Sequence, residues 1–207
     1  MAKKQRFSNP LALAVLVLLF ERPMHPYEMA ATLKERHKED SIKLRYGSLY
    51  TVIDLLRKEG FIVPREKQRE GRRPERTVYD LTPVGCEEMQ SWMRSILSIP
   101  VKEYPQFEAG LSLMPALPPD EVAALLEVRM ARLRQRVEVL EAGHALAIQQ
   151  GISPLFLVES EYELALTAAE QRFVEQLVGK IKDERWESVK FWRNFHQKRI
   201  EMEDRKE

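Results

Sequence analysis

The sequence contains very little cysteine and none of the spacings that bind metal. Cys86 is the single cysteine, so an internal disulfide is impossible, and no CxxC or paired Cys/His pattern offers the ligands of a zinc site. No nucleophile and base pair and no phosphate-binding loop stands out either. We therefore expect an intracellular, cytoplasmic protein with no cofactor, no metal and no enzymatic activity.

The sequence also lacks an apolar run long enough to span a bilayer, which takes roughly 20 residues. The most apolar stretch, residues 11–20, follows a basic start and resembles a signal peptide. No small-residue cleavage site follows it. Asn9 is a good N-cap and Pro10 suits the first helical position. These features favour a buried helix that is capped in place, and no membrane partner is expected.

No charge of one sign predominates, because 33 Lys and Arg residues stand against 32 Asp and Glu residues, a net charge of +1. The charges are nevertheless unevenly distributed. Residues 1–98 contain 18 basic and 13 acidic side chains, whereas residues 99–207 contain 15 and 19. This asymmetry indicates a basic module joined to a neutral or acidic one.

The hydrophobic periodicity predicts a mainly α fold with one small β-hairpin. Five prolines, at 100, 105, 115, 118 and 119, mark a linker. They suggest two domains, a winged helix-turn-helix over 1–98 and a linker with a helical dimerisation and effector domain over 99–207. The predicted elements are helices 10–21, 26–38, 46–59 and 83–97, strands 61–66 and 76–81, and then helices 106–114, 119–149 and 154–195.

The third predicted helix has an apolar face and a hydrogen-bonding face. The apolar face is formed by Leu49, Val52, Ile53 and Leu56. Hydroxyl and cationic groups on the other face suit contacts with phosphates and base edges, although an ordinary solvated face would look the same. A basic hairpin follows, and three helices before such a hairpin is the order of a winged helix-turn-helix. The candidate DNA-binding residues are Lys43, Arg45, Ser48, Tyr50 and Thr51 at the helix and Arg69, Arg72, Arg73 and Arg76 in the wing.

Three segments of this domain resemble the PadR family of bacterial transcriptional regulators: HPYEMAATL, GSLYTVIDLLRKEGFI and GRRPERTVYDLTPVG. The resemblance covers most of residues 9–97, and the whole length is similar to the larger PadR subgroup with virulence-activator-like members. It implies a winged-helix homodimer that binds a pseudo-palindromic double-stranded DNA operator, most often as a repressor. The positions that match family residues near DNA are Tyr27, Ser48, Tyr50, Thr51, Arg72 and Arg73. Members often carry glycine before the helix-two tyrosine, where this chain has Pro26.

The carboxy-terminal half shows apolar residues at spacings of three and four in two long helices, which approximates a coiled-coil seam. We expect part of this surface to pair within the chain and part to pair with a second subunit. The residues assigned to dimerisation are Leu126, Met130, Leu133, Val137, Leu140, His144, Phe173 and Leu177. His144 is interpreted as a hydrogen-bonded interface histidine.

Aromatic side chains gather near the carboxy terminus, and aromatics at helical spacing are more often core than ligand site. PadR-like proteins nevertheless suggest effector pockets lined by aromatic residues, so Trp92, Trp186 and Trp192 are candidates for binding a planar hydrophobic effector. The alternative function is a coiled-coil interaction module whose winged helix contacts protein rather than DNA.

Overall fold

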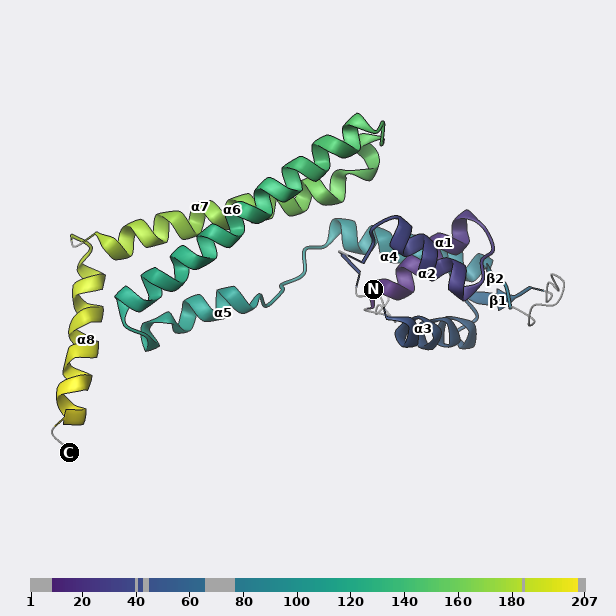
Figure 1. Ribbon diagram of the computed structural model, residues 1–207. Coiled ribbons are helices and arrows are strands. Elements are labelled where there is room, and N and C mark those ends of the chain that lie inside the picture. Colours follow the sequence, from purple (N-terminus) through teal and green to yellow (C-terminus); the bar gives the residue numbers. More distant parts are fainter. Residues whose placement is uncertain (1–8, 40, 43–44, 66–76, 184, 205–207) are drawn as a thin grey trace. The chain divides into compact units, whose positions relative to one another are not determined.

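The computed structural model describes residues 9–39, 41–42, 45–65, 77–183 and 185–204, and the chain divides into two compact units, Met1–Lys102 and Glu103–Glu207. Helices dominate both, and the sheet is one two-stranded antiparallel hairpin (Figure 1). The predicted fold class is therefore confirmed. The first unit contains α1 (Pro10–Glu21), α2 (Pro26–Glu35), α3 (Tyr46–Lys58), β1 (Ile62–Pro64), β2 (Tyr79–Leu81) and α4 (Pro83–Ser98). Among the described residues, no helix combines the length and apolar character needed to cross a membrane.

Helix α1 forms the centre of the first unit, where it packs against α3, α4 and β2. Most of its apolar side chains are buried, including Leu11, Val15 and Leu16, which are fully enclosed, whereas Phe20 in the last turn is exposed. The Asn9 side chain accepts a hydrogen bond from the Leu11 N–H at 3.0 Å, so the predicted cap is present. The apolar run near the amino terminus is thus the core helix of this unit.

Helix α2 ends at Glu35 and not at residue 38 as predicted. The chain turns there because His37 adopts a positive φ of 52°. The Lys38 N–H then donates to the Leu33 carbonyl at 2.9 Å, and the His37 N–H donates to the Lys34 carbonyl at 2.9 Å. This is the Schellman arrangement that closes many helices, usually with glycine at the left-handed position. The sequence did not predict this turn because histidine is a much weaker signal for it than glycine.

A bidentate ion pair joins the ends of α1 and α2. Both terminal nitrogens of Arg36 donate to the Glu21 carboxylate, at 2.6 and 2.7 Å. The hydrogen bonds from Arg36 hold the pKa of Glu21 below its ordinary value, although partial burial of the carboxylate acts to raise this pKa. A carboxyl whose pKa is lowered by folding stabilises the protein above its unfolded pKa, and this contribution is lost as the pH falls through the folded pKa.

Glu21→Gln is therefore expected to lower the stability of the first unit at neutral pH by roughly 1 kcal/mol or less, since the pair is partly exposed. The difference from the native protein should shrink as the pH falls below about 4, near the pKa of a free glutamate. Urea unfolding at a series of pH values measures both. A stability difference that stays constant down to pH 2 would contradict the role given to Arg36.

The hairpin pairs Ile62 with Leu81 and Pro64 with Tyr79, so both strands are shorter than predicted. Pro64 has no N–H to donate to a ladder, although the Arg65 N–H still bonds the Val78 carbonyl at 2.8 Å. An isolated bridge between Met24 and Tyr79 attaches the hairpin to the segment before α2. The hairpin is thereby fixed to the helical core at its base.

The end of the hairpin is locked to the start of α4 at Thr82 and Gly85. The Thr82 hydroxyl donates to the carbonyls of Gly60 and Phe61 and accepts from the Gly85 N–H at 3.0 Å. Gly85 is buried so closely that an added Cβ would lie 2.1 Å from the Phe61 carbonyl oxygen. A glycine is therefore required where α4 crosses the exit of α3, and this joint sets the position of the hairpin relative to α3.

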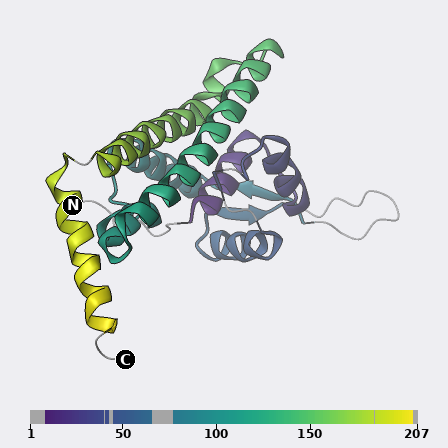
Figure 2. The ribbon, with the colours of Figure 1, turned by 60° about the vertical axis from the view of Figure 1, so that its left-hand side comes forward.

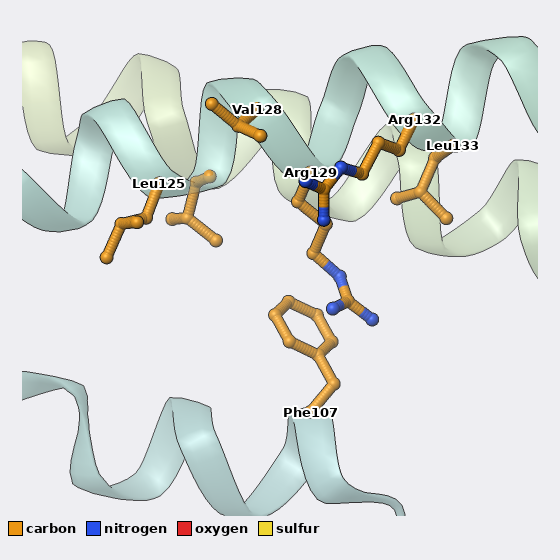
Figure 3. Close-up of a pocket in the computed structure, with 7 residues that line it drawn as sticks. Phe107, Leu125, Val128, Arg129, Arg132 and Leu133 are labelled. Carbon is orange, nitrogen blue, oxygen red and sulfur yellow. The ribbon is translucent and has the colours of Figure 1, made fainter.

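The regular elements in the described part of the second unit are helices: α5 (Gln106–Leu113), η1 (Met114–Ala116), α6 (Pro119–Gln149), η2 (Pro154–Phe156), α7 (Val158–Lys182) and α8 (Glu187–Asp204). Helices α6 and α7 form a long antiparallel pair (Figure 2). Ion pairs cross between them, Arg129 with Glu170 and Arg136 with Glu163, and Lys182 also pairs with Glu127. The Arg129 guanidinium also lies 3.7 Å from the centre of the Phe107 ring on α5 (Figure 3). Gly151, with a positive φ of 79°, turns the chain between the two helices.

The predicted continuous helix 154–195 is wrong, because the chain breaks between α7 and α8. The Asp183 carboxylate accepts a hydrogen bond from the Arg185 N–H at 3.0 Å, and the Trp186 N–H bonds the Asp183 carbonyl. An aspartate that binds the backbone two residues on competes with helix continuation. The break lets α8 fold back, so that Val189 and Trp192 join the core formed by α6 and α7.

Candidate nucleic-acid interface

Helix α3 has one face in the core and one face outside. Leu49, Val52, Ile53 and Leu56 are all 5% exposed or less, as the periodicity predicted. Helix α3 also contacts α1 and α2, and β1 follows it directly. The buried face therefore fixes the direction in which the opposite side chains of α3 project.

The outer face of α3 presents the predicted hydroxyl groups. The Tyr50 side chain is 51% exposed, Thr51 is exposed and Ser48 is half-buried. The Thr51 hydroxyl donates to the Gly47 carbonyl of its own helix at 2.9 Å, which leaves its oxygen free to accept. Arg45, immediately before the helix, is exposed. This face can donate and accept hydrogen bonds over the first two turns of α3.

Tyr27 lies in the first turn of α2, which packs against α3. Its side chain is 62% exposed, and its backbone N–H is held by the His25 ring at 3.1 Å. Pro26 occupies the first helical position and is buried, so the departure from the glycine that PadR members often carry is accommodated in α2. Two exposed tyrosines, Tyr27 and Tyr50, thus stand on neighbouring helices.

The predicted interface also includes basic residues of the hairpin and of the segment before α3. The basic residues Lys43, Arg69, Arg72, Arg73 and Arg76 lie outside the described residues. Arg65, at the base of the hairpin, forms an ion pair with Asp80 at 2.7 Å. Its charge is thus compensated locally, a pairing across the strands that the linear order of charges does not reveal.

Two exposed cations on α3 were not among the candidate DNA-binding residues. Arg57 and Lys58 are exposed in the last turn of α3, and Arg57 lies 3.8 Å from Asp54, a loose pair one turn away. Both cations lie at the carboxy-terminal end of α3, which its dipole favours. Helical spacing places both cations on the outer face of α3, but it offers no signal that separates a phosphate contact from an ordinary solvated charge.

The residues assigned to dimerisation on α6 face α7 of the same chain. Leu126 is buried, and Met130, Leu133 and Leu177 pack against the same core. The His144 ring lies 3.4 Å from the Ser160 hydroxyl and 3.8 Å from the Glu161 carboxylate, and both residues lie in the first turn of α7. This seam is therefore covered largely within the chain, because a three-four spacing does not say which helix covers it.

On α7, the residues buried against α6 differ from Phe173 and Leu177, which were assigned to dimerisation. Val174, Val178 and Ile181 are the buried residues of α7, whereas Phe173 is 48% exposed. On α6, Val137 and Leu140 are half-buried. A second subunit could therefore reach Phe173, while Leu126 has almost no surface left to offer.

The three tryptophans belong to two different cores. Trp92 is 4% exposed in the core of the first unit, and Trp192 is 6% exposed in the core of the second. The Trp192 N–H donates to the Leu117 carbonyl at 2.8 Å, and Trp186 is half-buried beside the same core. Trp92 and Trp192 thus act in packing, and neither ring is exposed enough to form the open face of a ligand pocket.

The helices α2 and α3, followed by the β1–β2 hairpin, define the first unit as a winged helix-turn-helix domain. Residues 15–91 match the model of the Transcriptional regulator PadR-like family. Residues 15–91 are therefore a domain of the PadR-like family of transcriptional regulators.

Solved structures share the fold over most of the chain. PadR from Bacillus subtilis, in complex with operator DNA, is 20% identical with a TM-score of 0.67, covering 84% of this chain and 100% of that one. The same protein in complex with p-coumaric acid gives 20% identity and a TM-score of 0.66, covering 84% and 99%. A PadR-like regulator from Bacillus cereus is 15% identical with a TM-score of 0.56, again covering 84% and 99%. The comparison with curated proteins gave no match.

Proposed function

We propose that this protein is a dimeric, sequence-specific DNA-binding transcriptional regulator that acts as a repressor. The observation that carries the proposal is the outer face of α3, where Tyr50 and Thr51 are exposed while the opposite face is anchored in the core. A rigid helix with exposed donors and acceptors can enter the major groove and hydrogen-bond to base edges. Tyr27 on α2 and Arg45 before α3 would contact the backbone phosphates.

The charge distribution supports the same role for the amino-terminal unit. Residues 1–98 carry the excess of basic side chains, and the predicted wing arginines Arg69, Arg72, Arg73 and Arg76 fall in the hairpin segment of the sequence. Phosphate neutralisation by such side chains supplies much of the affinity of DNA-binding proteins. The structure of Bacillus subtilis PadR, which has a similar fold and is bound to operator DNA, supports DNA binding by this chain. Because a bacterial transcriptional regulator acts in the cytoplasm, the proposal also places this protein there.

Relief of repression by a small hydrophobic molecule is the second part of the proposal. It is supported by the structure of Bacillus subtilis PadR in complex with p-coumaric acid. Because Trp92 and Trp192 are buried in packing, Trp186 is the predicted aromatic residue with surface to offer such a molecule. The effector of this chain is expected to be planar and apolar.

Selection of bound duplexes from a random DNA pool tests the function. The expected result is enrichment of one motif with two inverted half-sites spaced by about one helical turn, roughly 34 Å between centres, because a two-fold dimer presents two α3 helices. Enrichment of a single half-site would contradict the dimeric part of the proposal. No enrichment over several rounds would contradict sequence-specific binding.

The second candidate is a protein-interaction module, and exposed aromatic side chains on α8 favour it. Phe191 is 75% exposed and Phe195 is 51% exposed in a helix that also carries several cations. Exposed apolar clusters of this kind mark protein contacts. This function predicts no enrichment in the DNA selection, so the same experiment separates the two candidates.

A further inference from the structure

Helix α2, which carries Tyr27, begins with a histidine as its N-cap. His25 has an extended backbone, and its ring Nδ1 accepts a hydrogen bond from the Tyr27 N–H at 3.1 Å. Helices usually begin with Ser, Thr, Asp or Asn at this position, and a side-chain oxygen then accepts the bond. In this chain the oxygen is replaced by a ring nitrogen that can itself bind a proton near neutral pH.

The acceptor role of His25 fixes the protonation state of its ring. An imidazole nitrogen accepts a hydrogen bond only while it carries no proton, so the ring proton must be on Nε2. Protonation of Nδ1 would turn the acceptor into a donor that faces the Tyr27 N–H. It would also place a positive charge at the amino-terminal end of α2, where the helix dipole disfavours cations. The cap therefore exists only in the neutral form of His25, and acid removes it.

A second bond closes the same helix start from the other direction. The Glu28 carboxylate accepts a hydrogen bond from the His25 backbone N–H and pairs with Arg22 at 2.6 Å. The hydrogen bond from Arg22 holds the pKa of Glu28 below its ordinary value, although burial acts to raise it. This is the reciprocal arrangement of a capping box, with histidine in place of serine or threonine. Because Glu28 stays ionised in mild acid, the side-chain bond of His25 is the part of the box that a proton breaks.

The charged and titratable groups around this helix start come from every element packed on it. They are Glu28 on α2, Arg22 after α1, Glu21 at the end of α1, Tyr79 on β2, and the exposed Asp54, Arg57 and Lys58 of α3. Glu28 and Arg22 act on a charged His25 with opposite signs. Asp, Glu, Tyr, Lys and Arg ordinarily titrate outside the range of about pH 5 to 8, within which histidine titrates. We therefore assign a change of the α2 cap in this range to His25.

The residue held by this cap is the proposed DNA contact on α2. Tyr27 lies in the first turn, directly after the buried Pro26, and its side chain is 62% exposed. A helix start frays when its first N–H groups lose their partners. The bridge between Met24 and Tyr79 holds the chain just before His25, so the fraying would be confined to the first turn. The Tyr27 hydroxyl would then no longer be held in one position.

We propose that His25 is a positioning residue for DNA binding: its neutral ring caps α2 and holds Tyr27 in place, so that sequence-specific binding weakens in mild acid. The inference rests on the proposed DNA-binding function. It adds to that function a residue and a pH dependence that binding by α3 alone does not require. His25 acts through Tyr27 and needs no contact of its own with DNA.

Affinities of the full chain for a selected duplex, measured by fluorescence anisotropy at about pH 8 and about pH 5.5 and constant ionic strength, test the proposal. A shuffled duplex is measured in parallel, because protonation of surface histidines strengthens binding to any DNA. The ratio of the two affinities is the sequence preference. For the native protein it should fall roughly 3- to 10-fold from the higher pH to the lower, because the effect is limited to the one hydrogen bond that Tyr27 makes.

Three variants locate the pH dependence. His25→Asn supplies a cap that does not titrate, so its preference should change less than about twofold between the two pH values. His25→Ala has no cap and should show the weaker preference at both. His37→Asn is the matched control, because His37 lies at the other end of α2 with a φ of 52°, which asparagine also adopts. It should keep the fall of the native protein.

Two further readouts separate positioning from general stability. In a chain that already carries Tyr27→Phe, His25→Ala should change the preference less than about twofold, because the contact that it positions is already absent. Proton–nitrogen correlation spectra of the His25 ring at the higher pH should show the tautomer that carries its proton on Nε2.

A native preference that is equal at the two pH values, or a fall that persists in His25→Asn, would overturn the inference and leave the proposed function intact. Loss of the fall in His37→Asn, a proton on Nδ1, or a full effect of His25→Ala beside Tyr27→Phe would overturn it as well. A native protein without any preference for the selected duplex at the higher pH would refute the DNA-binding function itself, and the role of His25 would fall with it.

Discussion

Gly85→Ala is expected to lower the free energy of unfolding of the first unit by about 3 kcal/mol, the upper end of the usual cost of overpacking. The new Cβ would lie 2.1 Å from the Phe61 carbonyl oxygen and 2.9 Å from its carbon, and a backbone carbonyl cannot rotate away as a side chain can. Either α4 moves or the exit of α3 moves. Both changes would loosen the joint that connects α3 to the hairpin.

The thiol of Cys86 can report this effect, because it is the single cysteine and lies on α4, half-buried, in the first unit. Labelling of the thiol in increasing urea follows the unfolding of this unit separately from the other. Gly47→Ala is the control, since a Cβ at Gly47 meets nothing within 4 Å. It should leave the midpoint unchanged or raise it slightly, since alanine favours a helix. A Gly85→Ala midpoint equal to that of the native protein would contradict the account of the joint.

Removal of two hydroxyl groups is expected to have the largest effect on DNA binding. The variant Tyr27→Phe with Tyr50→Phe should bind a selected duplex roughly 10 to 100 times more weakly, because each lost hydrogen bond costs about 0.5 to 1.5 kcal/mol. Both rings are more than half exposed, so loss of the hydroxyl leaves the fold intact. Fluorescence anisotropy with a labelled duplex measures the change.

Tyr162→Phe is the matched control for this experiment. Tyr162 is 67% exposed on α7, in the second unit, and makes no proposed contact with DNA. Its replacement should leave the affinity unchanged. If the double variant also binds as tightly as the native protein, neither tyrosine hydroxyl contacts the operator, and the recognition face assigned to α2 and α3 is wrong.

The local fold of the first unit could be predicted from the sequence because its signals act over a few residues. Asn9 and Pro10 start α1, and the spacing of Leu49 and Leu56 identifies the buried face of α3. Gly85 was identified only as part of a family motif. The reason that a glycine is needed there is its close contact with Phe61, which is distant in the sequence. The turn at His37 has only a weak local signal, since a positive φ is uncommon outside glycine even though histidine is enriched there.

Prediction was weaker for the second unit because helix pairing is a long-range property. A three-four spacing placed Leu126 and His144 on a seam, but it could not say that α7 of the same chain covers that seam. The helix break at Asp183 depends on one side chain competing with the backbone, and periodicity on both sides of it continues without a gap.

The central claim is that two copies of the α3 face read two DNA half-sites in a specific sequence. Its most direct test is a titration of the full chain with a selected duplex and with the same duplex after one half-site is shuffled, both at physiological salt. The account predicts two chains per intact duplex and an affinity loss of at least about 100-fold on shuffling, because specific sites bind about 10³ to 10⁷ times more tightly than random DNA. Equal affinity for the two duplexes would contradict it.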